Sequence, residues 1–435
     1  MAEQPAKKRR MEAPPPPAHC SVLRLARHAV TLPDDALLSP GAAHSTRVAV
    51  AALPSADATE YQAFLASGRR VYSVAVPRSG AFVGGRGKEG VFIAEQGAPA
   101  TAAELPALQL RAEVQHLALA EGGGGSAVLA AVDCYGRAVL AQARRGEGAA
   151  GLQVVAAHQL QPPDVLREPG WAGVAVAPGA PSQAAVARHF AKDVTLFDGP
   201  MAVRSIHTLY RPTAVQLLSP QLSVGPQGGP LVAVTEGPQL SIWDVRGHGR
   251  GARVAKLSPG PHHGHLYCIA ASDGGGLPLI GAAGAERSVL VWEPRKWALL
   301  DRWSNCLKYE ATGLHFSSGS PRLCFVGGMD YEVLCGEWGG NKASRLGGGN
   351  RAANATHTGL KTGPAAAAEG APAAAAGDGG DGSSSGAAAG GSTLGRGVSF
   401  RGDSRWMGLA KAAGQDIVAG MTQSCQMYVA EFECR

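Results

Sequence analysis

Few residues of this 435-residue sequence combine the types and spacing that chemistry needs. The run HHGH (262–265) gathers three imidazoles, which are common metal ligands, but no cysteine or carboxylate stands at ligand spacing nearby. The run GGRGK (84–88) resembles a phosphate-binding loop, but Phe82 replaces its first glycine and Glu89 its final Ser or Thr. The sequence offers no local Ser/His/Asp or Cys/His set. We therefore expect no metal, no cofactor and no enzymatic activity.

The cysteines carry no pattern of their own. No two are spaced as CxxC, and most lie in apolar stretches such as LCF (323–325). They are Cys20, Cys134, Cys268, Cys306, Cys324, Cys335, Cys425 and Cys434. Scattered thiols fit a reducing compartment and not a secreted disulfide framework. We also expect no secretion signal and no membrane span, because no apolar run follows the basic N-terminus and none reaches ~18 residues.

The net charge of +6 is concentrated at the N-terminus. Lys7, Lys8, Arg9 and Arg10 form one basic run before a run of prolines, which leaves +2 for the rest of the chain (6 − 4). The run resembles a short nuclear-import signal, and the alternative is a solvated tail. The nearly neutral remainder lacks a basic stripe, so we expect no direct nucleic-acid binding. We expect a location in the nucleus, the cytoplasm or both.

Two segments read as disordered, and hairpins fill the rest of the chain. Residues 1–19 form a basic, proline-rich tail, and residues 339–396 are an insertion rich in Gly, Ala and Ser. Elsewhere an apolar stretch meets a short turn and a second alternating stretch, which is typical of β-hairpins. These predicted hairpins cover 63–76, 129–143, 184–198, 232–244, 279–293, 324–338 and 417–431.

The hairpins recur at the period of a β-propeller. Five of seven residues near the ends of their second strands are acids: Ala75, Gln142, Asp198, Asp244, Glu293, Glu337 and Glu431. From Gln142 to Glu337 successive members are 56, 46, 49 and 44 residues apart, and a propeller blade uses about 40–50 residues. We predict an all-β, seven-bladed propeller. Blades one to six occupy residues 20–338, and residues 397–435 complete the last blade. The sequence leaves open a count of eight blades, with an extra strand pair near Val91–Glu95.

Two hairpins carry more specific residues. The fourth ends in SIWD (241–244) and the fifth in VLVWE (289–293). These ends resemble the WD-repeat (transducin beta-like) family, of which this chain would be a divergent member. The resemblance implies that Trp243, Asp244, Trp292 and Glu293 end third strands. It also implies that His265, 27 residues before Trp292, helps to position its blade. The hydroxyl residue of the family's His–Trp network is replaced by alanine.

Ring closure needs a strand from one terminus to complete a blade formed by the other, because open sheet edges invite aggregation. Residues 21–30 alternate weakly between apolar and polar types. We expect this segment, or Thr46–Leu53, to form the outer strand of the last blade.

The candidate partner-binding residues follow the repeat signature. Arg246 and Arg295 each stand two residues after the acid, as in substrate receptors of cullin–RING ubiquitin ligases, where that arginine contacts an adaptor. The alternative is that each arginine pairs only with residues near it in its own repeat. Trp297 and Trp303 are either a partner-binding hot spot or core. The predicted function is a non-catalytic scaffold that binds other proteins. Alternatives are a ligase receptor and a nuclear ribosome-assembly or RNA-associated factor.

Overall fold

The computed structural model of the chain describes residues 18–33, 44–54, 57–78, 91–122, 125–145, 152–222, 230–247, 252–260, 263–272, 277–339 and 397–435. The chain divides into two units, one of residues 1–341 with 397–435 and one of residues 342–396. The second unit, the basic run 7–10 and nearly all of the predicted insertion lie outside the described residues. Within the described ranges, no helix is long and apolar enough to cross a membrane.

Five separate four-stranded antiparallel sheets account for most of the described strands, and each uses four strands that are consecutive in the chain. They are β7 (Val114–Glu121), β8 (Ser126–Asp133), β9 (Ala138–Arg145) and β10 (Leu152–Leu160); β11 (Ala172–Ala177), β12 (Ala180–Arg188), β13 (Asp193–Asp198) and β14 (Met201–His207); β15 (Pro212–Leu218), β16 (Leu231–Glu236), β17 (Gln239–Asp244) and β18 (Arg253–Leu257); β19 (Leu266–Ala271), β20 (Ile280–Gly284), β21 (Val289–Glu293) and β22 (Ala298–Trp303); β23 (Ala311–Phe316), β24 (Leu323–Gly328), β25 (Glu332–Glu337) and β26 (Val398–Arg401). Two 3₁₀ turns, Pro106–Leu108 and Pro220–Leu222, lie between strands.

A nine-stranded sheet joins the two ends of the chain, in the order β2-β3-β4-β6-β1-β29-β28-β27 with β5 beside β1. Its strands are β1 (Cys20–Thr31), β2 (Val48–Val50), β3 (Glu60–Ser67), β4 (Arg70–Pro77), β5 (Glu95–Gln96), β6 (Ala100–Glu104), β27 (Trp406–Lys411), β28 (Ile417–Thr422) and β29 (Gln426–Cys434). Two antiparallel groups of four meet here, because β1 pairs along its length with β29 but runs parallel to β6 only at Val30 and Thr31. The structure therefore has five separate four-stranded sheets instead of the predicted seven.

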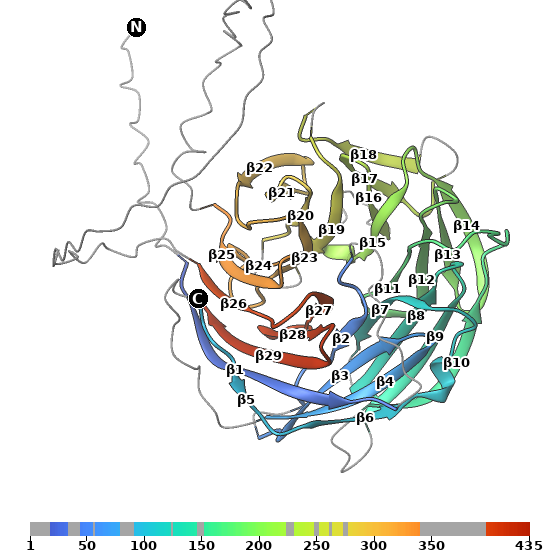
Figure 1. Ribbon diagram of the computed structural model, residues 1–435. Coiled ribbons are helices and arrows are strands. Elements are labelled where there is room, and N and C mark those ends of the chain that lie inside the picture. The colour runs from blue at the N-terminus through green and yellow to red at the C-terminus, as the bar shows by residue number, and fades with distance from the viewer. Residues whose placement is uncertain are drawn as a thin grey trace, which may run out of the picture. The chain divides into compact units, whose positions relative to one another are not determined.

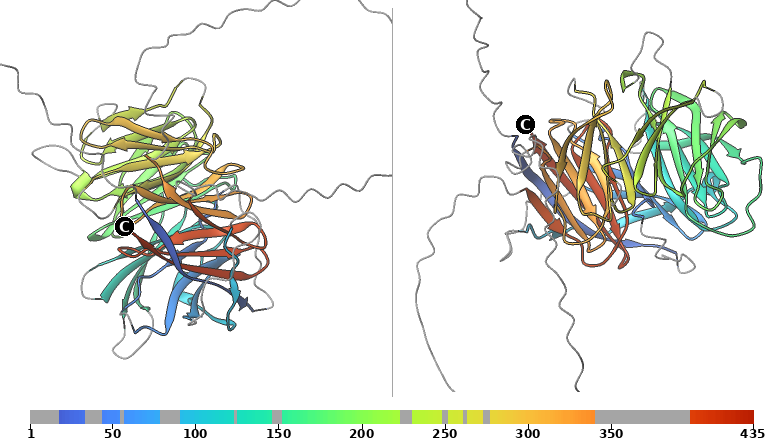
Figure 2. Two further views of the ribbon diagram at one scale, coloured as in Figure 1. Left: turned by 90° about the vertical axis from the view of Figure 1, so that its left-hand side faces the viewer. Right: turned by 90° about the horizontal axis from the view of Figure 1, so that it is seen from above.

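The first strands of successive groups contact one another in chain order and close into a ring. The contacts run from β2 to β7, β11, β15, β19, β23 and β27, and β27 contacts β2 again. The apolar core lies between neighbouring groups: one cluster joins β11–β14 to β15–β18, and another joins β15–β18 to β19–β22. Figure 1 and the turned views of Figure 2 show the sheets side by side around this ring. The predicted all-β, propeller-like arrangement of small sheets is confirmed.

Each predicted hairpin falls on two adjacent antiparallel strands. The segment 232–244, for example, covers β16 and β17, whose alternating side chains are buried on both faces of the sheet. Gly237 makes the tight turn between them with a φ of +55°, a conformation that glycine adopts without a steric penalty.

The structure also shows how the ends of the chain are used. β1 is the outer strand beside β29, as the first of the two closure alternatives predicts, whereas the segment 46–53 contains the inner strand β2. β26 pairs with β25, so the four-stranded group that closes the ring begins at β27 and not at residue 397. The region near Val91–Glu95 leads into β5 and β6, and β6 is the fourth strand beside β4.

Candidate functional site

The two signature tryptophans lie in the core between neighbouring sheets. Trp243 of β17 is 6% exposed and packs between the sheets β11–β14 and β15–β18. Trp292 of β21 is 2% exposed and packs between β15–β18 and β19–β22. The indole Nε1 of Trp243 is buried without a hydrogen-bond partner, and the Arg253 guanidinium lies 5.7 Å from its ring centre. Both rings therefore hold adjacent sheets together by apolar packing.

His265 does not take the position that the family resemblance implies. Its side chain is exposed, and its ring makes an edge contact with Tyr267 at 6.5 Å between centroids. Among the described residues, no hydrogen bond joins His265 to Trp292 or its neighbours on β21. The described residues thus contain no His–Trp network of the kind that the resemblance implies, consistent with alanine where the resemblance implies a hydroxyl residue.

Trp297 and Trp303 lie on β22 or in the turn before it, and both are partly buried. Trp297, in the turn, has a φ of +51° and packs against the same core as Trp292. The Trp303 ring lies against Gly336 and the core of the next sheet. This placement favours the packing role over a partner-binding hot spot.

Arg246 and Arg295 occupy corresponding turns of two neighbouring sheets, after β17 and after β21. Arg246 binds Asp244 of its own turn, with Nη2 3.1 Å from Oδ2 and Nε 3.2 Å from Oδ1, and its backbone N–H donates to Oδ1 at 2.8 Å. These bonds hold the pKa of Asp244 below its usual value. Arg246 remains half exposed and Arg295 is exposed, so both can reach a partner.

The segment 44–47, which precedes β2, lies at the centre of the ring. The Ser45 hydroxyl forms a hydrogen bond with the Thr312 hydroxyl at the start of β23 (3.0 Å). The Ser45 backbone carbonyl accepts the backbone N–H of Leu409 in β27. Thr46 donates its hydroxyl to the Gln115 carbonyl of β7 at 2.6 Å. Because β7, β23 and β27 belong to three different groups, the segment ties the inner strands of separated parts of the ring together.

Aromatic rings extend from this segment to further sheets. The His44 ring lies 4.7 Å from Trp171, just before β11, and 6.0 Å from Tyr267 in β19, measured between centroids. His116 of β7 lies 6.4 Å from Trp171 and accepts the backbone N–H of Val174 through Nδ1. The imidazoles are thus packed among rings as structural groups.

Burial keeps these two imidazoles neutral and makes stability depend on pH. Burial lowers the pKa of His44 to about 3, with a smaller contribution from repulsion by the nearby His189 and His116 rings when these are protonated. Burial alone lowers the pKa of His116 to about 4. The ordinary pKa is about 6.5 in the unfolded chain. As pH falls below that value the unfolded state binds more protons, so the free energy of unfolding decreases. At pH 5 the loss should be about 2 kcal/mol for each histidine.

Urea unfolding at pH 7.5 and pH 5.0 checks this expectation. In His44→Gln the difference between the two pH values should shrink by about 2 kcal/mol relative to the wild type. His265→Gln is the matched control, because His265 is exposed. An unchanged pH difference in His44→Gln would contradict the buried, neutral state of His44.

The loops next to His189 carry exposed apolar side chains. We define the aromatic patch as Phe190, Leu209, Tyr210 and Arg211, from the β12–β13 and β14–β15 turns. Phe190, Leu209 and Tyr210 are 42%, 56% and 45% exposed, and Arg211 is also exposed. The Arg211 guanidinium lies 5.0 Å from the Phe190 ring centre, so the two turns are in contact. Tyr, Arg and Phe are the residue types enriched in protein-binding surfaces.

Polar anchors beneath the patch hold its two turns in place. The backbone N–H of Tyr210 donates to the buried Glu236 carboxylate at 2.8 Å, and the Thr208 hydroxyl donates to the Tyr210 carbonyl at 2.7 Å. His189 Nδ1 bonds to the Pro212 carbonyl at 3.0 Å, which links the turns directly. In the same sheet, the buried Arg188 pairs with Asp193 across the base of the β12–β13 turn. The patch is therefore preformed, which lowers the entropic cost of binding.

Sequence reasoning missed the patch and the central segment. Phe190 and Tyr210 lie in turns, where the hairpin pattern supplies no reason for a large aromatic residue. Their presence in turns is the signal that could have found them. Comparison with known proteins adds nothing to this assignment, since neither a protein-family model nor a curated protein matches the chain.

Proposed function

We propose that this chain is a non-catalytic scaffold that binds other proteins, built as a seven-bladed propeller of the WD-repeat type. In this proposal the nine-stranded sheet counts as two blades, since among the described strands its two groups of four pair with each other just at Val30 and Thr31. The seven core clusters found among the described residues support the count, because each lies between two neighbouring groups of strands.

The aromatic patch is the observation that carries the binding role. Its three apolar side chains are exposed on turns that buried hydrogen bonds hold in place, and Arg211 adds a charged group able to bind a carboxylate. Exposure of an aromatic cluster to water on a rigid turn is unfavourable in free energy and does not stabilise the fold. A partner that covers the cluster is the simplest reason for its presence.

The test is affinity purification of the full chain from its native cells, followed by binding measurements with each recovered partner. Phe190→Ser combined with Tyr210→Ala should lower the affinity for the partner that binds this patch by about 30-fold or more, since a hot-spot residue contributes 2 kcal/mol or more to the binding free energy. Met201→Ser with Val203→Ser is the matched control, because these β14 side chains are 69% and 67% exposed. Equal binding by the patch variant and the control would remove the patch from this role.

The same purification tests the ubiquitin-ligase alternative. Arg246→Ala combined with Arg295→Ala should lose an adaptor protein if these turns bind one, and a wild-type purification without any adaptor would remove the alternative. A location in the nucleus stays a prediction that depends on the basic run Lys7–Arg10. The ribosome-assembly alternative also stays a prediction.

A further inference from the structure

Three cysteines that are far apart in the sequence meet where the chain ends join. Cys20 of β1, Cys335 of β25 and Cys434 of β29 place their Sγ atoms within 4.8 Å of one another. Among the described residues this is the one such group of potential metal ligands. We call it the three-thiol group. Cys335 and Cys434 are 1% and 8% exposed, whereas Cys20 is partly exposed and leaves a path from solvent.

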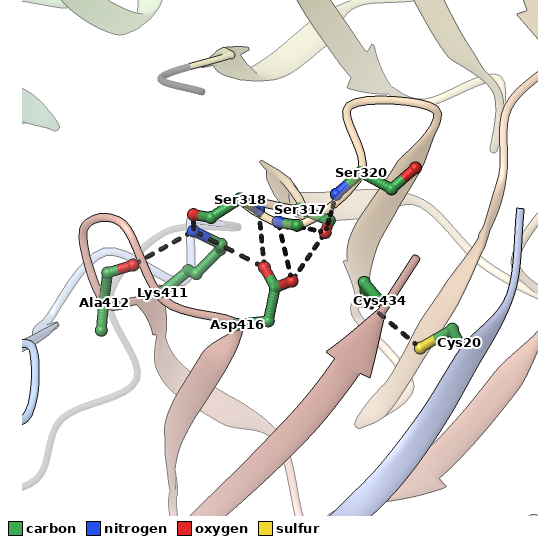
Figure 3. Close-up of polar contacts among 9 residues, drawn as sticks. Cys20, Ser317, Ser318, Ser320, Lys411, Ala412, Asp416 and Cys434 are labelled. Carbon is green, nitrogen blue, oxygen red and sulfur yellow. Dashed lines mark hydrogen bonds and ion pairs between the residues drawn. The ribbon is translucent and has the colours of Figure 1, made fainter. Parts of the chain in front are cut away.

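Backbone pairing fixes the positions of two of the thiols. Cys20 and Cys434 stand directly opposite each other in the antiparallel β1–β29 pair, 414 residues apart in the sequence. The neighbouring residues His19 and Arg435 exchange both backbone hydrogen bonds, at 3.0 and 2.9 Å. Cys20 and Cys434 therefore form a pair without backbone hydrogen bonds, in which side chains lie closest. Their Sγ atoms lie 3.5 Å apart. Figure 3 shows the two side chains near each other.

The separations match those of thiolates around a tetrahedral zinc ion. A Zn–S distance of about 2.3 Å with tetrahedral angles puts two sulfur atoms about 3.8 Å apart. The distance of 3.5 Å for one pair and the limit of 4.8 Å for all three are on either side of that value. Three thiolates can thus bind one ion with small side-chain adjustments and no movement of the strands.

A polar group beside Cys434 supplies the surroundings that a metal site needs. The Asp416 carboxylate accepts the Ser317 hydroxyl and the Ser318 backbone N–H, both at 2.7 Å, and lies 3.9 Å from Lys411 Nζ (Figure 3). The Asp416 backbone carbonyl accepts the N–H of Phe432, two residues before Cys434, at 2.8 Å. Three thiolates and a divalent ion carry a net charge of −1, and the Asp416–Lys411 pair adds none, so the buried charge stays small.

The third thiol distinguishes a metal site from a disulfide. Cys20 and Cys434 alone could form a covalent bond, but that would leave the most buried member, Cys335, without a role. We propose that the three-thiol group binds one Zn²⁺ ion through Cys20, Cys335 and Cys434. The ion joins both terminal strands to the neighbouring sheet, and its fourth position is open to water. This proposal is independent of the protein-binding role.

Cobalt substitution tests the site on the full chain. The protein is purified under reducing conditions, stripped with a chelator, dialysed and titrated with Co²⁺, which reports thiolate ligands by a charge-transfer absorption band. We expect one Co²⁺ per chain, displaced by Zn²⁺. Cys20→Ser, Cys335→Ser and Cys434→Ser should each abolish or strongly weaken the band. Cys134→Ser is the control and should keep it, because Cys134 is outside the group.

A second measurement separates loss of the ligand from loss of the fold. The melting temperature of the wild type and of Cys134→Ser should fall by several degrees after chelation and recover with Zn²⁺, because an ion that binds only the folded state stabilises it. The proposal is overturned if the reduced wild type gives no thiolate–cobalt band and no Zn²⁺-dependent melting. A band that persists in Cys335→Ser overturns the three-ligand site. Alkylation and mass measurement that find Cys20–Cys434 oxidised in protein isolated from cells overturn it in favour of a covalent link.

Discussion

Removal of residues 1–33 is expected to abolish cooperative folding, because it deletes β1 (Cys20–Thr31). β1 pairs with β29 from Cys20 to Ala29 and buries Leu25 (0% exposed) and Val30 (5% exposed). Burial of each such side chain contributes about 1.5–3 kcal/mol, and each backbone hydrogen bond about 0.5–1.5 kcal/mol. The sum is comparable to the whole stability of a typical domain, about 5–15 kcal/mol. Thermal melting of the purified protein measures the effect.

The deletion also exposes the edge of β29 and breaks a polar junction. The Glu431 carboxylate of β29 lies 3.4 Å from Arg24 of β1, accepts the Tyr61 hydroxyl of β3 and pairs with Arg78 at 2.8 Å. Loss of β1 leaves an unpaired strand edge, so the truncated protein should aggregate.

A truncation that removes only residues 1–17 is the control for this experiment and should melt like the full chain, since it keeps β1. A synthetic peptide of residues 18–33 should restore soluble, cooperatively folded protein by adding the missing strand to the exposed edge. A chain lacking residues 1–33 that melts cooperatively at the full-length temperature would contradict the closure of the ring by β1.

The hairpins could be predicted from the sequence because their information is local. In β16–β17, for example, alternation of apolar residues, a turn glycine and the acid at the strand end all lie within 13 residues (232–244). The outer strands were harder: β14 exposes Met201 and Val203 and buries Ile206, which gives no alternating pattern. Tertiary pairing, not local propensity, decides such strands.

The three-thiol group had no local signal. The cysteines are scattered in the sequence, and only the closing pairing of β1 with β29 brings Cys20 to Cys434. The acids near the ends of the second strands indicate a repeat in the sequence, but they have different roles in the structure. The Asp244 side chain is 26% exposed and binds its own turn, whereas Glu431 is buried and joins β1 and β29 to β3. A shared sequence position thus serves ring closure in one group and a turn in another.

Trp243→Ala and Trp292→Ala are each expected to reduce the free energy of unfolding by about 3–5 kcal/mol, because each leaves a cavity between two sheets. The two rings belong to different core clusters, so the double variant should lose about 6–10 kcal/mol, close to the sum. That loss would unfold a protein of ordinary stability. Urea unfolding monitored by circular dichroism provides the measurement, and Leu299→Ala on the exposed side of β22 is the control, with a change within about 0.5 kcal/mol.

Trp243→Phe distinguishes apolar packing from a polar network at this position. The Trp243 Nε1–H is buried without a partner, so its removal costs no hydrogen bond, and the phenyl ring still fills most of the space between the sheets. A buried unpaired donor is itself unfavourable by about 1–3 kcal/mol. Trp243→Phe should therefore change stability far less than Trp243→Ala. If the two substitutions cost the same, the indole N–H has a bonding role in solution that packing alone does not explain.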